Sequence, residues 1–150
     1  MKDIEQFLIT ARTKTYAGST GKVAPLLDGS KQLEYAEGDW LYRDIYYTGK
    51  STFNGIETVF HNNKPVFGMS YYGNWGDMTE TEIDLVLRAA LIAEPTTRLC
   101  KKIEWVKDVF IYICEPDTNT DANEIGGTEI ISKKGVQVYK FYYAGGLLIH

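Results

Sequence analysis

Apolar and polar residues alternate with two different periods along this chain, and each period predicts a different kind of element. Apolar residues at positions 4, 7, 8 and 11, separated by polar ones, predict a short amphipathic helix over residues 3–13. A second helix is predicted after Thr79, because Thr79 and Glu82 form a T-x-x-E capping box ahead of an apolar face that starts at Ile83. Pro95 marks the end of this helix, since proline cannot continue it.

Residues 33–73 and 106–143 contain the alternation that is typical of strands. In the first region, strands are predicted over 40–47, 56–61 and 65–72, and the sequence His-Asn-Asn-Lys at 61–64 predicts a turn because Asn tolerates positive φ. In the second region, strands are predicted over 106–114, 128–132 and 136–143, with a polar loop over 116–126 and a turn at 133–135. Each half of the chain is therefore expected to contain one helix and three strands.

The two halves also match each other in sequence. The stretch from Gly55 to Gly73 aligns without a gap with Gly127 to Gly145, at an offset of 127 − 55 = 72 positions. The alternative is that any two hairpins with this period look alike. We predict an α+β fold made of a duplicated helix-plus-three-strand (αβββ) unit, with an antiparallel sheet or sheets covered by two helices. The chain is then a single domain of two pseudo-repeats, approximately residues 1–76 and 77–150.

Composition and charge narrow the range of functions. The formal net charge is −4 and the basic residues are scattered, so direct nucleic-acid binding is not expected. The first residues, MKDIEQFL, do not resemble a signal peptide, and no apolar run approaches the ~20 residues of a membrane span. We therefore expect a cytoplasmic protein without a membrane partner. Cys100 and Cys114 lack metal-ligand spacing and are expected to be reduced thiols rather than a disulfide, and no metal or cofactor is predicted.

The repeat selects candidate functional residues. Glu57 and Glu129 occupy equivalent positions, each two residues after a glycine, so the two carboxylates would converge if the halves meet in a cleft. Strand parity places Asp44 on one face with three aromatic residues, where a carboxylate needs a partner. The candidate ligand-binding residues are Glu57, Glu129, Asp44, Trp40, Tyr42 and Tyr46. The alternative is that each glutamate only caps a strand or accepts backbone hydrogen bonds in the preceding turn.

These residue types favour one function over two others. Carboxylates among aromatic rings attract cations, so the partner we expect is a cationic or aromatic small molecule. A second hypothesis is an enzyme with Glu57 or Asp44 as general base and a tyrosine as acid, although no catalytic residue is assigned. A third is an interaction module that uses its tyrosine-rich sheet either to form a homodimer or to bind another protein partner. Phe67, Met69, Tyr71, Tyr139, Phe141 and Tyr143 are expected on the opposite face, packed under the helices.

Several segments together resemble a known family. They read L-x-Y from Leu33, G-D-x-x-Y-x-D from Gly38, F-x-G-x-E-x-V from Phe53 and P-V-F-x-M-x-Y-x-G from Pro65, where the family pattern often has Trp in place of Phe67. The resemblance is to an uncharacterised bacterial domain family of unknown function, found alone or C-terminal to helix-turn-helix domains in predicted transcription regulators. A looser analogy is to effector-binding domains of multidrug-responsive regulators. The resemblance implies a sensor or effector-type domain with an acidic, aromatic-lined cleft.

Overall fold

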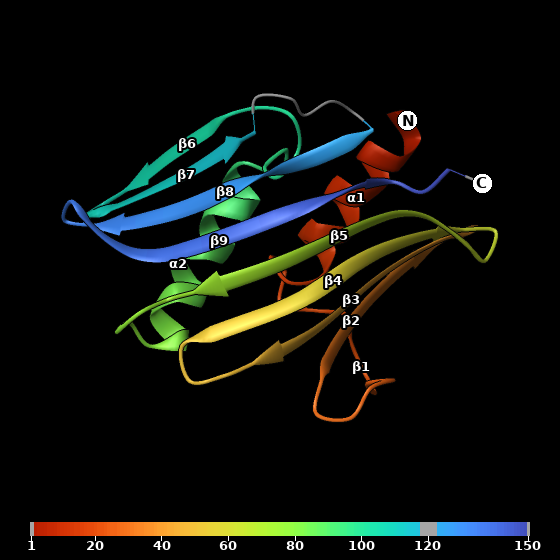
Figure 1. Cartoon of the computed structure of the whole chain (residues 1–150), viewed down its shortest axis with the longest axis horizontal. Helices are drawn as coiled ribbons and strands as arrows, with labels where there is room; N and C mark the ends of the chain where they lie inside the picture. The colour runs from red at the N-terminus through yellow and green to blue at the C-terminus, as the bar shows by residue number, and fades with distance from the viewer. Residues whose placement is uncertain (1, 118–122, 150) are drawn as a thin grey trace.

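The computed structural model describes residues 2–117 and 123–149, and its elements form one antiparallel sheet with two helices beside it (Figure 1). The elements are α1 (Lys2–Lys14), β1 (Lys22–Val23), β2 (Lys31–Glu37), β3 (Trp40–Thr48), β4 (Thr52–His61), β5 (Lys64–Asn74), α2 (Glu80–Ala93), β6 (Ile103–Lys107), β7 (Phe110–Pro116), β8 (Glu124–Lys133) and β9 (Val136–Leu147). The strand order is β1-β2-β3-β4-β5-β9-β8-β7-β6. The last strand, β9, therefore lies inside the sheet beside β5.

Both predicted helices are confirmed, with bounds close to those expected. The capping box of α2 is complete, since the Thr79 side chain accepts a hydrogen bond from the Glu82 backbone N–H and the Glu82 carboxylate accepts one from Thr79. The helix ends at Ala93, and its C-cap residue Glu94 lies directly before Pro95. No helix in the described part of the chain is long and apolar enough to cross a membrane.

The turns explain where the strands begin and end. Asn62 and Asn63 both adopt left-handed backbone conformations, with φ of 51° and 62°, so the predicted turn between β4 and β5 is confirmed. The prediction of one strand over 106–114 is wrong, because a turn at Asp108 (φ 52°) folds this segment into the hairpin of β6 and β7. The predicted loop over 116–126 gives way to β8 at Glu124, and its residues 118–122 lie outside the described part of the chain.

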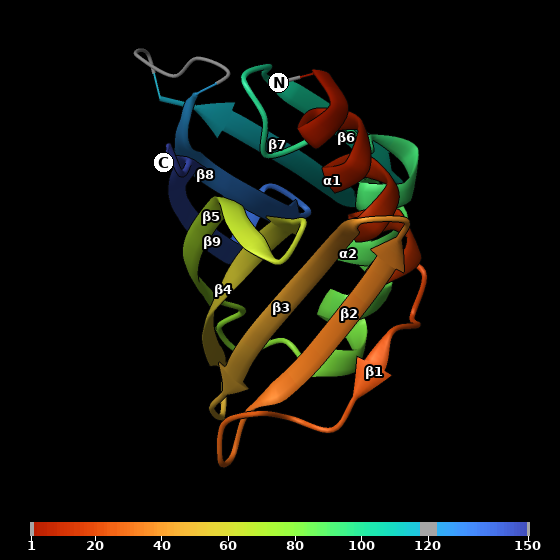
Figure 2. The same ribbon diagram turned by 90° about the vertical axis from the view of Figure 1, so that its right-hand side faces the viewer.

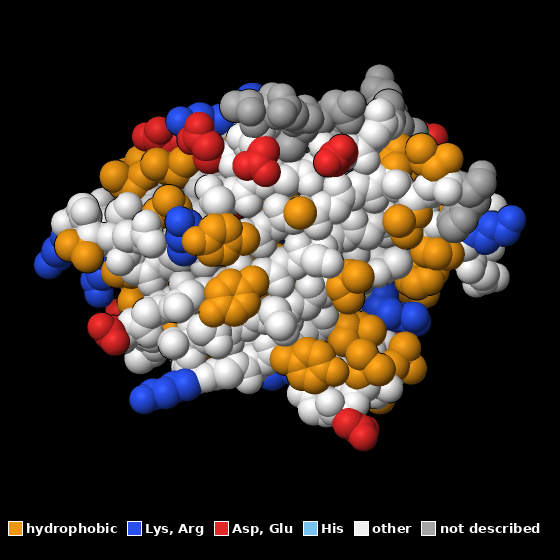
Figure 3. Space-filling model, viewed as in Figure 1, with side chains coloured by type: hydrophobic (Ala, Val, Ile, Leu, Met, Phe, Trp, Pro, Cys, Tyr) orange, Lys and Arg blue, Asp and Glu red, His pale blue; other side chains and the backbone are white. Residues whose placement is uncertain are grey.

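The predicted duplicated αβββ unit with its sheet covered by two helices is wrong. The strands form one nine-stranded sheet, with β1–β5 on one side of the β5–β9 pairing and β6–β9 on the other. The two helices lie on one face only and do not cover the sheet (Figure 2), while the opposite face is open to solvent (Figure 3). Pairing of β5 with β9 satisfies the backbone groups that two separate sheets would leave at their edges. The class is a mixed α+β fold.

The core lies between the sheet and the helices, and the pairing register shows which side chains face it. Asp44 pairs with Glu57, and Glu57 pairs with Met69, so the three residues point to the same face. The expectation that the Asp44 ladder and the Met69 ladder occupy opposite faces is therefore wrong. Five of the six residues of the second ladder are core as predicted, since Phe67, Met69, Tyr139, Phe141 and Tyr143 are at most 3% exposed. The sixth, Tyr71, is only partly buried. Cys100 and Cys114 are not joined by a disulfide.

Candidate functional site

A cavity of about 420 Å³ lies between the helix-bearing face of the sheet and the two helices. Strands β1 to β5 and β9 contribute to its walls, together with α1, α2 and the segment that follows α2. Its aromatic lining comes from Tyr16, Tyr42, Tyr46, Phe53, Tyr71, Trp75 and Phe141. A volume of this size is typical of pockets for small organic ligands, which are mostly apolar with a few placed polar groups.

Asp44 is the buried acid of this cavity. Asp44 is 6% exposed, and the Tyr71 hydroxyl donates a hydrogen bond of 2.6 Å to Oδ1 of Asp44. Burial, followed by the negative charge of Glu57, raises the pKa of Asp44 to about 7, although the Tyr71 hydroxyl and the two buried arginines act in the opposite direction. Within the described residues Asp44 belongs to no ion pair, so its charge has no direct counter-ion.

Glu57, directly opposite Asp44 on β4, has a full set of partners. Arg12 of α1 donates from Nη2 to Oε2 at 2.6 Å and from Nε to Oε2 at 3.1 Å, and the Tyr42 hydroxyl donates to Oε1 at 2.9 Å. Burial alone would raise the pKa of Glu57, but the charge and hydrogen bonds of Arg12 outweigh it and hold this pKa below its ordinary value. Glu57 is therefore an ionised carboxylate whose charge Arg12 neutralises.

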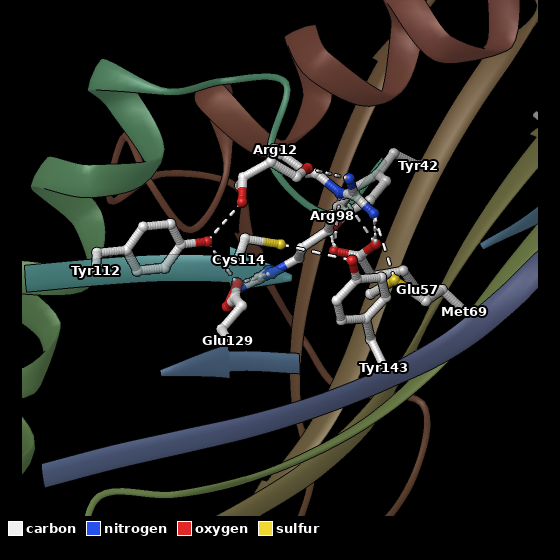
Figure 4. A network of polar contacts seen from close by, with 10 residues as sticks. Arg12, Tyr42, Glu57, Met69, Arg98, Tyr112, Cys114, Glu129 and Tyr143 are labelled. Carbon is white, nitrogen blue, oxygen red and sulfur yellow. Dashed lines mark hydrogen bonds and ion pairs between the residues drawn. The ribbon is translucent and has the colours of Figure 1, made fainter. Parts of the chain in front are cut away.

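Glu129 has the same kinds of partner and belongs to the same network of polar contacts as Glu57 (Figure 4). Arg98 donates from Nε to Oε1 and from Nη2 to Oε2, and the Tyr112 hydroxyl donates to Oε1 at 2.9 Å. Arg98 has a left-handed backbone (φ 59°) and lies 4.4 Å from the centroid of the Phe141 ring. Burial lowers the pKa of Arg98, but the charge of Glu129 and its hydrogen bonds more than reverse this, so the pKa of Arg98 lies well above its ordinary value.

The structure brings four of the six predicted site residues to the cavity. Asp44, Glu57, Tyr42 and Tyr46 line it. Glu129 does not, because it is fully buried behind Arg98. Trp40 stacks on His61 with 4.1 Å between ring centroids and packs against Phe7, away from the cavity. The predicted convergence of the two glutamates is thus replaced by two separate ion pairs, and ligand binding by these residues stays a prediction.

Sequence reasoning missed the arginines that partner the glutamates. A signal for Arg12 was available, because Arg12 follows Leu8 by four residues and so lies on the apolar face of α1. A charged residue on such a face requires a buried partner of opposite charge. Arg98 follows α2 in a segment without periodicity, and no sequence pattern marks it.

Comparison with known proteins identifies a family, but the function of that family is unknown. No curated protein and no solved structure matches the chain. A family model described as a domain of unknown function, DUF5680, matches residues 44–148, which is 148 − 44 + 1 = 105 of the 150 residues. The match begins at Asp44 and includes both buried glutamates and Arg98, while α1 with Arg12 precedes it. The chain therefore belongs to the DUF5680 family of domains of unknown function.

Proposed function

We propose that this domain binds a small aromatic molecule with a positive charge in the cavity between the sheet and the helices, with Asp44 as the counter-ion. The observation that carries the proposal is the environment of Asp44. It is buried, it lies on the cavity wall, and no cationic side chain pairs with it in the described chain. A buried carboxylate without a counter-ion is costly, and a ligand cation would supply the missing charge.

The charges of the neighbouring residues support this assignment. Arg12 is committed to Glu57 and Arg98 to Glu129, so the two arginines cancel the two glutamates. When Asp44 ionises, it therefore gives the inner wall one net negative charge. An anionic ligand would meet this charge together with arginines that are already paired.

The aromatic walls would favour the body of such a ligand. Phe53 contacts Trp75 at 5.8 Å and Tyr71 at 6.0 Å between ring centroids, and all three line the cavity. Flat rings can stack on the ligand, and their faces attract a cation. The resemblance to domains that accompany helix-turn-helix regulators supports a sensor or effector-type role for this binding.

The test compares amines with uncharged molecules of the same shape. We expect para-methylbenzylamine and tryptamine to bind more tightly at pH 8 than para-methylbenzyl alcohol and tryptophol, measured by isothermal titration calorimetry and by thermal shift. The substitution Asp44→Asn keeps the shape of the side chain and should abolish the preference for the amines. Equal affinity for amine and alcohol, or an amine preference that survives in Asp44→Asn, would contradict the proposal.

A second candidate is acid–base catalysis, which one observation favours. Asp44 and the Tyr71 hydroxyl form a hydrogen-bonded pair at 2.6 Å, and the pKa of Asp44, raised by burial to about 7, suits proton transfer near neutral pH. An enzyme would convert a bound compound with a bell-shaped pH profile, and both Asp44→Asn and Tyr71→Phe would abolish turnover. Nuclear magnetic resonance can show whether each bound compound is recovered unchanged. If all of them are, the result favours binding without catalysis.

A further inference from the structure

We infer that the ligand of this cavity is amphoteric, with a cationic end at Asp44 and an anionic group at its outer end that Lys22 recognises. This inference rests on the proposed function and adds a specificity-determining residue and a substrate class to it. Lys22 is exposed on β1 and lines the rim of the cavity.

Pairing of charges singles out Asp44 and Lys22. Nine charged residues line the cavity, and seven of them are members of ion pairs. Those seven are Arg12, Lys31, Glu57, Glu80, Asp84, Arg88 and Arg98. The remaining two, 9 − 7 = 2, are Asp44 and Lys22, for which the described chain offers no ion-pair partner. The cavity therefore presents one unpaired negative charge inside and one unpaired positive charge at its rim.

The sheet register sets the separation of these two charges. Lys22 pairs with Leu33 on β2, and Leu33 pairs with Asp44 on β3, so the three residues form one cross-strand row. Opposed residues of neighbouring antiparallel strands share a face, and neighbouring strands lie about 4.8 Å apart. The backbone positions of Lys22 and Asp44 are therefore about 10 Å apart on the cavity side of the sheet. Leu33, which is buried and lines the cavity, forms the apolar floor between them.

This spacing defines the shape of the ligand. Both side chains extend from the same row, and the long lysine side chain can lean toward or away from Asp44. One aromatic ring between an ammonium and a carboxylate fits a gap of this length. The ring would lie over Leu33 and beside Tyr46, which lines the cavity from the same strand as Asp44. We therefore expect aromatic compounds with an amino group and an acid group on opposite sides of the ring.

The experiment uses probes that differ only in the outer group. At pH 8, para-(aminomethyl)benzoate and the longer para-(aminomethyl)phenylacetate carry both charges, para-methylbenzylamine carries only the cation, and para-xylylenediamine carries two cations. We expect the better-fitting amphoteric probe to bind the wild-type protein about two- to five-fold more tightly than para-methylbenzylamine, the size expected of one partly exposed ion pair. Lys22→Gln should remove this preference, and Lys22→Glu should transfer it to para-xylylenediamine.

A control variant separates recognition from overall charge. Lys64→Gln removes the same charge from an exposed position at the start of β5 that does not line the cavity, and it should retain the wild-type preference. If Lys22→Gln and Lys22→Glu leave the order of affinities unchanged, the inference is wrong. The proposed function would survive that result as long as para-methylbenzylamine still requires Asp44. If para-methylbenzylamine binds no better than its alcohol, the proposed function itself fails.

Discussion

Replacing Asp44 by Asn should stabilise the protein at alkaline pH and have little effect at acidic pH. Asp44 is buried beside Glu57, and burial raises its pKa from the ordinary 3.8 to about 7. A carboxyl group with a raised pKa in the folded state stabilises that state in full below its unfolded pKa. This contribution is lost as the pH rises through the folded pKa. The wild-type protein therefore becomes less stable between about pH 4 and pH 8, whereas the Asn variant lacks this loss.

The size of the effect follows from the two pKa values. Each unit of difference between the folded and unfolded pKa changes the free energy of unfolding by about 1.4 kcal/mol. The rise from 3.8 to about 7 therefore corresponds to about 4 kcal/mol. For a chain of 150 residues, 1 kcal/mol shifts Tm by roughly 2–4 °C, so the variant should gain on the order of 10 °C relative to wild type between pH 4 and pH 9. Asn can still accept the hydrogen bond from the Tyr71 hydroxyl, so the geometry is preserved.

The assay is urea unfolding of both proteins across this pH range, with the difference in free energy of unfolding plotted against pH. Asp39→Asn, in the exposed turn before β3, is the matched control and should follow the wild-type curve. A difference between wild type and Asp44→Asn that is constant with pH would refute the reasoning. A stabilised variant that also loses the amine preference would show that Asp44 is retained for binding at the expense of stability.

Three further substitutions test the fold, each measured by urea unfolding. Arg98→Met should destabilise by about 3–5 kcal/mol because it leaves Glu129 buried without its cation, and adding Glu129→Gln should restore part of the loss. Gly145→Ala should destabilise the protein by at least about 1–3 kcal/mol, because a Cβ there would clash with the Gly68 carbonyl oxygen. Gly68→Ala should be tolerated, because a Cβ there would have no neighbour closer than 3.9 Å. Thr79→Ala should cost about 1 kcal/mol through loss of the cap, and Thr79→Ser should not.

Local sequence patterns predict the start of α2 and the turn between β4 and β5, because both depend on residues that are close together in the sequence. The capping box at Thr79 and the paired asparagines at 62 and 63 each carry their own physical reason, and both are confirmed. The strand over 106–114 is predicted without its break because the turn at Asp108 contains neither glycine nor proline, so neither of these turn residues marks it in the sequence. No local pattern shows that β9 pairs with β5, since that pairing joins residues about 75 positions apart, as in Met69 with Gly145.

Only the part of the candidate site that local sequence patterns mark could be predicted. Asp44 and Glu57 stand out because acids within apolar strands need an explanation, and the structure places them opposite each other on the cavity wall. The aligned pair of Glu57 and Glu129 predicts one shared cleft, but whether two carboxylates share a cavity depends on the side chains around them. Here Arg98 pairs with Glu129. Arg98 lies outside the helices and strands, so no periodic pattern marks it in the sequence.

The position of β9 in the sheet has a consequence for synthesis of the chain. Strands β2 to β5 can pair as they emerge from the ribosome, because each follows its neighbour in sequence. The edge of β5 then stays unpaired until synthesis has reached residue 147 and β9 can pair with it. During that interval β5 exposes unpaired backbone groups that could pair with another chain. We expect nascent chains that stop before β9 to aggregate, and full-length chains to complete their folding only after synthesis has passed β9.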